Sequence, residues 1–244
     1  MNIAVIFAGG VGSRMHTKTK PKQFLDIHEK PIIVHTIEKF QNHPEMDAIV
    51  VACVEDWIPY LSQLVQRYHL DKVKKIVPGG RNGQESIFNG LVAAKEISRD
   101  ERSIALIHDG VRPLITMNLI TDNINSVKKY GSAITSVKVK ETVLVVDDIN
   151  DNVIEEIPSR AKTRLARAPQ SFWLDDILEA HHMAIEDGKL DFIDSCSMMT
   201  YYGKKLYLVE GPMENIKITT PDDFYTMRAL LDAKENAQIY GYEE

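Results

Sequence analysis

The sequence predicts a single α/β domain with a mainly parallel β-sheet, helices on both faces of the sheet and one protruding β-hairpin arm. Continuous apolar runs of strand length recur along the 244 residues, for example at 48–54 and 103–108. Such runs are typical of strands that are covered on both faces. Segments with helical periodicity lie between them, and this alternation indicates parallel strands joined by helices. A polar segment that interrupts the alternation predicts the arm.

Each element follows from its apolar pattern and from the signals at its ends. Short apolar runs predict strands at 3–7, 48–54, 73–77, 103–108 and 132–137. Apolar residues at helical spacing predict helices at 32–40, 58–68, 84–97 and 116–130. The last of these helices has Thr116 as its N-cap and is stopped by Gly131. A final helix begins after Thr220, with Pro221 at its first position, and a short strand is expected before it.

The arm is predicted from the segment 137–157, where β-branched and charged residues alternate around Asp147-Asp148-Ile149-Asn150-Asp151-Asn152. This pattern predicts a polar-faced β-hairpin that projects from the sheet. Because an isolated hairpin rarely buries its own apolar side, we expect a dimerisation arm. A solvated hairpin without a partner is the alternative.

Composition and charge exclude several classes of protein. The formal net charge of -6 at pH 7 argues against nucleic-acid binding, which favours a basic surface. The two cysteines, Cys53 and Cys196, have no paired spacing, so neither a disulfide scaffold nor a zinc site is expected. No apolar run approaches ~20 residues, so we expect no signal peptide, no membrane span and a cytoplasmic location.

The strongest candidate for a binding site is the glycine-rich loop after the first strand. It reads Ala8-Gly9-Gly10-Val11-Gly12-Ser13-Arg14-Met15 and is followed by Pro21-Lys22-Gln23-Phe24. Backbone N–H groups in such a loop can cradle phosphate oxygens, and Arg14 and Lys22 add two cations. The spacing fits neither a Walker A loop nor a dinucleotide-binding fingerprint. We therefore expect a phosphate-rich ligand at this loop.

A carboxylate follows another predicted strand, in His108-Asp109-Gly110-Val111-Arg112-Pro113. Ligands of open parallel sheets lie beyond the carboxyl ends of the strands, so Asp109 should meet the first glycine loop there. Close to a triphosphate, this carboxylate is interpreted as a Mg²⁺ ligand, and a turn or N-cap residue is the alternative. Arg112 is expected to pair with Asp109 or to structure the loop. His108 is interpreted as a packed residue at the strand end.

A second glycine-rich turn, Gly79-Gly80-Arg81-Asn82-Gly83-Gln84-Glu85-Ser86, joins a predicted strand to a predicted helix. Glycines let the backbone approach a flat base closely, and Ser86 can hydrogen-bond the edge of that base. We interpret the turn as a base-binding element. A plain βα turn, in which Ser86 only starts the helix, is the alternative.

Three further segments complete the candidate site. Lys217 lies on the short strand expected before Thr220, which can aim the lysine towards a phosphate. Arg160 follows the hairpin, and Ala168-Pro169-Gln170-Ser171-Phe172 follows another expected strand. Taken alone, Lys217 or Arg160 could equally be a solvated surface charge, so their interpretation depends on the motifs around them.

Together these blocks resemble the cytidylyltransferases that activate polyol phosphates. The resemblance spans almost the whole chain, from Ala8-Gly9-Gly10 to Asn215-Ile216-Lys217-Ile218-Thr219. It implies a Rossmann-like nucleotidyltransferase sheet, CTP and a polyol phosphate as substrates, and Mg²⁺ as cofactor. It also implies a homodimer joined through the β-arm.

The resemblance assigns expected roles to the candidate residues. Arg14, Lys22 and Lys217 would be the cationic contacts to the CTP phosphates and the transition state, and Asp109 would face Mg²⁺. Cytosine would contact Ser86 and the turn before it. The expected substrate-binding residues are Ala8, Gly9, Gly10, Gly12, Gly79, Gly80, Ser86, Arg112, Arg160, Ala168, Ile193 and Asp194.

The acceptor half departs from the family pattern at two positions. The family usually has Thr-Pro-Gln where this chain has Ala168-Pro169-Gln170, and Thr-Asp where it has Ile193-Asp194. Those threonines normally lie around the polyol phosphate. Arg160 falls where the family holds that phosphate, with the arm of a second subunit completing the pocket. A substrate group left without its partner costs about 1–3 kcal/mol, which is enough to shift specificity.

Two acceptors stay open. Gly9-Gly10 and the basic loop 16–21 look closer to the ribitol-5-phosphate enzymes of teichoic acid and capsule synthesis. The isoprenoid enzymes that use 2-C-methyl-D-erythritol 4-phosphate more often have Ala-Ala-Gly there. We therefore expect D-ribitol 5-phosphate, with the methylerythritol phosphate as the alternative. A sugar-1-phosphate nucleotidyltransferase would not be expected to have the blocks 168–170 and 215–217, and a non-catalytic nucleotide-binding protein is the remaining alternative.

Overall fold

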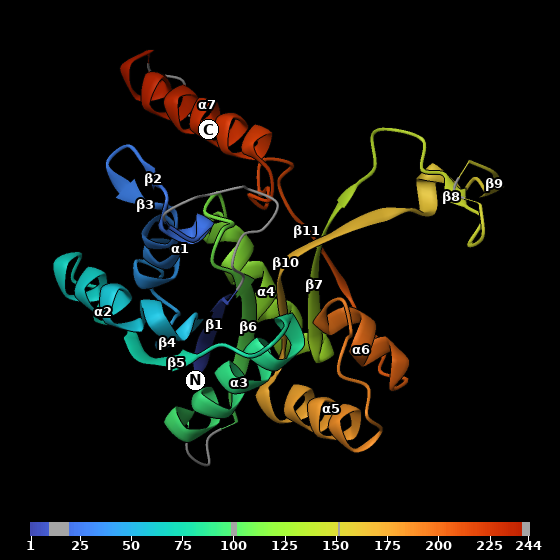
Figure 1. Ribbon diagram of the computed structural model, residues 1–244, viewed down its shortest axis with the longest axis horizontal. Helices are drawn as coiled ribbons and strands as arrows, with labels where there is room; N and C mark the ends of the chain where they lie inside the picture. The colour runs from blue at the N-terminus through green and yellow to red at the C-terminus, as the bar shows by residue number, and fades with distance from the viewer. Residues whose placement is uncertain (10–19, 99–101, 151, 241–244) are drawn as a thin grey trace.

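A seven-stranded β-sheet forms the centre of the computed structural model, which describes residues 1–9, 20–98, 102–150 and 152–240 (Figure 1). The strands lie in the order β11-β7-β10-β6-β1-β4-β5. Their bounds are β1 (Asn2–Ala8), β4 (Ala48–Cys53), β5 (Val73–Pro78), β6 (Ile104–Asp109), β7 (Ser132–Lys138), β10 (Arg164–Trp173) and β11 (Leu208–Glu210).

The predicted mainly parallel sheet is confirmed, with one strand in the opposite direction. β10 runs antiparallel to both β6 and β7, whereas the other neighbours pair in parallel. The reason lies in the connection: the chain leaves β7 into the arm and returns directly as β10. Neighbours joined by a hairpin are antiparallel, because a parallel pair needs a crossover connection. Ala168-Pro169-Gln170 therefore lies inside a strand, and the prediction that it follows one was wrong.

Helices cover both faces of the sheet, as predicted (Figure 1). The helices of one face are α1 (Ile32–Gln41), α2 (Ile58–Arg67) and α4 (Met117–Tyr130). Those of the other face are α3 (Gly83–Ser98), α5 (Leu174–Glu186) and α6 (Ser195–Tyr201). In β1, Ile6 belongs to the first of these two cores and Val5 to the second, and both are fully buried. Burial on both faces explains why the strands read as continuous apolar runs.

The helix ends follow the signals in the sequence. The Thr116 hydroxyl accepts the Leu119 N–H at 3.3 Å, and Gly131 has φ +88° at the end of α4. This confirms the predicted cap and stop, since a left-handed residue after a helix favours glycine. At the start of α7 (Pro221–Tyr240), the Asp223 carboxylate accepts the backbone N–H groups of Thr219 and Thr220 at 2.8 and 2.7 Å.

The segment before α7 is irregular, and the short strand predicted there was wrong. No strand is assigned at residues 211–220. The Asn215 N–H instead donates to the Pro212 carbonyl, and its side-chain amide donates to the Ala168 carbonyl at 2.7 Å. The segment is therefore anchored to β10 by a side chain rather than by a strand ladder.

A small hairpin packs against α7 and holds it to the rest of the fold through side-chain contacts. It consists of β2 (Asp26–Ile27) and β3 (Lys30–Pro31). His28 at its turn contacts Asp232 and Glu235 of α7 at 2.8 and 3.2 Å. Among the helices of the described ranges, α7 included, none is long and apolar enough to cross a membrane.

The predicted arm is present and extends away from the sheet (Figure 1). Its outer part contains a two-stranded ribbon of β8 (Val145–Val146) and β9 (Ile154–Glu156). Ile149 and Ile157 of the arm are 96% and 60% exposed. The arm thus presents apolar side chains that this chain does not cover.

Candidate active site

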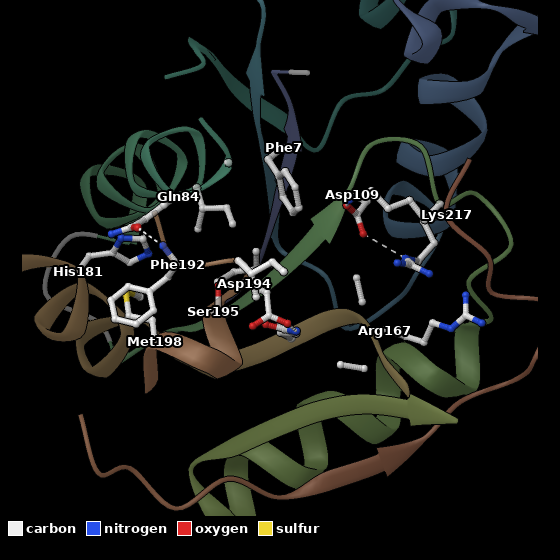
Figure 2. Close-up of a pocket in the computed structure, with 18 residues that line it drawn as sticks. Phe7, Gln84, Asp109, Arg167, His181, Phe192, Asp194, Ser195, Met198 and Lys217 are labelled. Atoms are coloured by element: carbon white, nitrogen blue, oxygen red, sulfur yellow. Dashed lines mark hydrogen bonds and ion pairs between the residues drawn. The ribbon is translucent and has the colours of Figure 1, made fainter. Parts of the chain in front are cut away.

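The candidate site lies at the carboxyl ends of β1 and β6, where the register pairs Phe7 with Asp109. Two cavities meet there. The glycine cavity, of about 560 Å³, is lined by Ala8, Gly9, Lys22, Gln23, Gly79, Gly80 and Ser86, among others. The β10 cavity, of about 290 Å³, is lined by Gln84, Arg112, Arg167, Ala168, Gln170, His181 and Asp194, among others (Figure 2). Phe7, Gly83, Asp109 and Lys217 line both.

The glycine cavity is built from two turns that approach each other closely. The Ser86 hydroxyl accepts the Gly80 N–H at 2.9 Å and donates to the Asn82 carbonyl at 2.8 Å. A Cβ on Gly9 would lie only 2.7 Å from that hydroxyl oxygen. Ser86 therefore fixes the second turn and also limits the size of the residue at position 9. Its predicted contact to a base stays a prediction.

Lys22 reaches the glycine cavity from a 3₁₀ turn, η2 (Lys22–Phe24). Its ammonium donates to the Ile218 carbonyl at 3.0 Å, which links this turn to the segment that carries Lys217. The neighbouring side chain, Gln23, is buried and donates to the Ala8 carbonyl at 2.7 Å. Two lysines from distant parts of the sequence are thus brought to one cavity, as predicted.

Asp109 is the electrostatic centre of the site. One carboxylate oxygen accepts from the Lys217 ammonium at 2.6 Å and the other from the Arg112 guanidinium at 3.1 Å. Burial by itself would raise the pKa of Asp109, but the charges of Lys217 and Arg112 outweigh it and bring the pKa to about 2. The carboxylate is therefore ionised at neutral pH, and the predicted pairing of Arg112 with Asp109 is confirmed.

His108 is a packed residue, as predicted. It is fully buried and its Nε2 contacts the Arg112 carbonyl at 2.9 Å. Burial lowers the pKa of His108 to about 4, so the ring is neutral at pH 7. It supports the Asp109 loop and lines neither cavity.

The β10 cavity has two distinct ends. Figure 2 shows Asp109, Lys217 and Arg167 at one end, and Gln84 and His181 at the other. His181 is 1% exposed, and neither ring nitrogen has a hydrogen-bond partner among the described residues. Burial, together with the nearby charge of His182, lowers the pKa of His181 to about 4. The first end is cationic and the second is neutral.

Asp194 joins the floor of this cavity to α6. Its carboxylate accepts the Ser197 N–H at 2.8 Å as the N-cap of the helix, and it accepts from the Gln170 amide at 3.0 Å. Burial would raise the pKa of Asp194, but these hydrogen bonds lower it further than burial raises it. Ile193 lies beside it at the cavity and is 91% exposed.

Some predicted site residues are not brought to the cavities. Arg160 lies in the arm, in η4 (Arg160–Lys162), where it donates to the Lys140 carbonyl at 3.4 Å, and it lines neither cavity. Gly10, Gly12 and Arg14 lie outside the described residues.

Sequence reasoning missed several residues that line the β10 cavity. Each has a polar side chain to which no role was assigned from the sequence, and they are Gln84, Arg167 and His181. Gln84 donates to the Lys189 carbonyl and accepts from the Phe192 N–H, so it fixes the loop that precedes α6. The available signal was weak: Arg167 directly precedes the block 168–170, and Gln84 lies inside the second glycine turn.

A mainly parallel sheet with two adjoining cavities at its strand ends, which share Asp109 and Lys217, is the architecture of a nucleotidyltransferase. Comparisons with known proteins specify the family. Residues 2–233 match the family 2-C-methyl-D-erythritol 4-phosphate cytidylyltransferase. The chain belongs to this family.

Relatives in the family have two different names. A ribitol-5-phosphate cytidylyltransferase of Streptococcus agalactiae is 58% identical over 99% of this chain and 100% of its own length. One from Vibrio parahaemolyticus is 53% identical, again over 99% of this chain and 100% of its own length. A 2-C-methyl-D-erythritol 4-phosphate cytidylyltransferase of Clostridium acetobutylicum is 40% identical over 95% of this chain and 97% of its own.

The fold is also that of a solved structure. The crystal structure of 4-diphosphocytidyl-2C-methyl-D-erythritol synthase from Anaerococcus prevotii superposes with a TM-score of 0.81 at 25% identity. The superposition covers 95% of this chain and 96% of that one. The predicted fold class and the predicted family of polyol-phosphate cytidylyltransferases are therefore confirmed. Mg²⁺, the dimer and the roles of individual residues stay predictions.

Proposed function

We propose that the protein transfers CMP from CTP to D-ribitol 5-phosphate, giving CDP-ribitol and pyrophosphate. The observation that carries the reaction type is the pair Asp109 and Lys217, which lies where the two cavities meet. The choice of acceptor is supported by the relatives: those at 53–58% identity have the ribitol-phosphate name, and Clostridium relatives with the methylerythritol-phosphate name are 36–40% identical. The expected products are precursors of teichoic acid or capsule.

In the reaction, a phosphate oxygen of the acceptor attacks the α-phosphorus of CTP. A new P–O bond forms to that oxygen, the bond between the α-phosphorus and its bridging oxygen to the β-phosphate breaks, and pyrophosphate leaves with the electron pair. The second pKa of a phosphate ester is about 6, so the nucleophile is already ionised at neutral pH. No general base is needed, which fits a site where His108 is buried and lines neither cavity.

The difficulty of this step is electrostatic, because two polyanions must meet. Lys22 and Lys217 line the glycine cavity, where their charges would stabilise the triphosphate and the negative charge that develops at the α-phosphate. We assign Arg14 the same role. These groups act by position and charge, and none of them needs to transfer a proton.

Asp109 fits a divalent cation in its donor chemistry, since it is an ionised oxygen ligand at the mouth of the triphosphate cavity. We propose that it would hold Mg²⁺ together with phosphate oxygens of CTP. The ion would neutralise part of the triphosphate charge. Asp109 now shares its two oxygens with Lys217 and Arg112, so it also orients both cations.

We further propose a homodimer through the arm. The arm presents exposed apolar residues, among them Ile149 and Ile157, and Arg160 lies too far out to line the cavities of its own chain. In the dimer, Arg160 of one subunit would complete the acceptor site of the other. A cytoplasmic location stays a prediction from the sequence.

The test is pyrophosphate release with CTP and Mg²⁺, with D-ribitol 5-phosphate and 2-C-methyl-D-erythritol 4-phosphate assayed in parallel. We expect a higher kcat/KM for the ribitol phosphate. A preference for the methylerythritol phosphate would contradict the proposed acceptor but not the reaction. No release with either acceptor would contradict both.

A further inference from the structure

One guanidinium in the β10 cavity has no role in the site so far. Arg167 lies on β10 where its pairing with β7 is irregular, between Ala166 and Gln170. Its side chain is half-buried and lines the β10 cavity but not the glycine cavity. It therefore belongs to the cavity assigned to the acceptor and not to the cavity assigned to CTP.

Arg167 is poorly satisfied by the protein itself. A guanidinium has five N–H donors, yet the Nε of Arg167 is buried without a partner among the described residues. Nη1 has only a long contact of 3.4 Å to the Asn215 carbonyl, which already accepts from Arg112 at 2.7 Å. Across the described ranges, no carboxylate forms an ion pair with Arg167, and Asp223 interacts with it only at longer range. A buried donor without an acceptor destabilises the folded protein, so an acceptor from a ligand would be favourable at this group.

The charge balance at this end of the cavity points to an anion. Arg112, Arg167 and Lys217 lie at this end, and the carboxylate that lines the cavity there, Asp109, is divided between Arg112 and Lys217. Burial and the charge of Arg112 lower the pKa of Arg167, and the charge of Asp223 offsets this only in part. An anion with several oxygens would satisfy both guanidinium groups, because their planar fork matches phosphate geometry.

The position of Arg167 also fits the reaction. Figure 2 shows it at the end of the cavity that holds Asp109 and Lys217, opposite His181. The attacking phosphate must reach this end, since Lys217 is shared with the triphosphate cavity. The next residue, Ala168, has no hydroxyl to offer a phosphate, and Arg167 is the charged donor with which β10 lines this cavity.

We propose that Arg167 binds the phosphate of the acceptor from within the same chain, beside Arg112. The ligand class is a dianionic phosphate monoester at the end of a polyol. This inference rests on the proposed function. It adds a phosphate contact that does not depend on the arm of a second subunit.

The experiment compares Arg167→Gln with the wild type in steady-state kinetics for each substrate. We expect the KM for D-ribitol 5-phosphate to rise about 10- to 100-fold, which corresponds to losing charged hydrogen bonds. The KM for CTP and the affinity for CTP measured by calorimetry should stay within about 2-fold, because CTP is assigned to the other cavity. Arg167→Lys should recover part of the lost acceptor affinity, since it restores the charge without the fork.

Arg164→Gln is the matched control. Arg164 lies on the same strand, lines neither cavity and donates to the Ala161 and Thr163 carbonyls, so its substitution should leave both KM values unchanged. An unchanged acceptor KM in Arg167→Gln, or a rise in the CTP KM instead, would overturn the proposal. Equal losses for both substrates together with a lower Tm would show a structural role through Asn215. Failure of the wild type to use either polyol phosphate would instead contradict the proposed function.

Discussion

The two cavities of the site are built from different parts of the polypeptide. The glycine cavity is bounded in part by backbone, at Gly9 and at the turn that contains Gly79 and Gly80. The β10 cavity is bounded by side chains from β10, α3, α5 and α6. A backbone surface requires glycine at fixed positions, whereas a side-chain surface can be assembled from many residue types. The glycine cavity, proposed for the nucleotide, can therefore be predicted from a sequence motif. The residues of the β10 cavity, proposed for the acceptor, are identified only from the three-dimensional structure.

The largest expected effect is a loss of turnover on removing a cation from the glycine cavity. Such a loss would show that the cations of this cavity stabilise the transition state. Lys22→Ala should lower kcat about 10²- to 10³-fold, by analogy with the loss of one donor to a developing negative charge. The affinity for CTP should fall far less, because Lys217 remains at the cavity. Single-turnover kinetics and calorimetry with CTP would separate the two quantities.

Lys20→Ala is the control for this substitution. Lys20 is two residues away, pairs with Asp26 at 3.5 Å and lines neither cavity. It should behave as the wild type. If Lys22→Ala kept its turnover and lost only CTP affinity, Lys22 would have no part in the chemical step.

The contrast between the cavities also explains what the sequence could predict. The strands β1, β4, β5, β6 and β7 were predicted closely, since burial on both faces produces unbroken apolar runs such as β4 and β6. The edge strand β11 (Leu208–Glu210) was not predicted. Asp109 and the first glycine loop were placed at one site because parallel strands end at the same edge of a sheet. The antiparallel direction of β10 was not predicted, because direction depends on the connection through the arm rather than on strand composition.

Residues of the β10 cavity were missed for a related reason. Arg167, Gln84 and His181 come from three different elements, and their local sequence gives only a weak signal that separates them from surface or core residues. Lys217 was placed correctly although the strand expected to aim it does not exist. Its position depends on the ion pair with Asp109, and on Asn215 bonding to Ala168, rather than on a strand.

A second prediction tests whether the acceptor half is completed by another subunit. Arg160→Ala and Lys217→Ala are each expected to be nearly inactive alone. Coexpressed with different tags, they should form mixed dimers in which one site has its own Lys217 and the partner's Arg160. Random pairing then restores about a quarter of wild-type activity, since half of the dimers are mixed and each of these has one intact site. If Arg160 acts within its own chain, mixing restores nothing.

The smallest expected effect tests the close approach of backbone turns that distinguishes the glycine cavity. Gly9→Ala should raise the KM for CTP about 10-fold, because the added Cβ would lie 2.7 Å from the Ser86 hydroxyl oxygen. The φ angle of Gly9 lies outside the left-handed region, so alanine is not excluded by backbone conformation. The effect should therefore be steric and local to Ser86.

The double variant Gly9→Ala/Ser86→Ala separates this cause from others. Without the hydroxyl, the nearest Ser86 atom to the new methyl group is its Cβ, at 3.6 Å, which is an ordinary contact. The double variant should bind CTP no worse than Ser86→Ala alone, so the two penalties would not add. Additive penalties would mean that the Gly9 backbone contacts the phosphates of CTP directly. In that case, the close contact with Ser86 would not be the reason why glycine is required at position 9. The glycine motif would then reflect the ligand rather than the packing of one turn against the other.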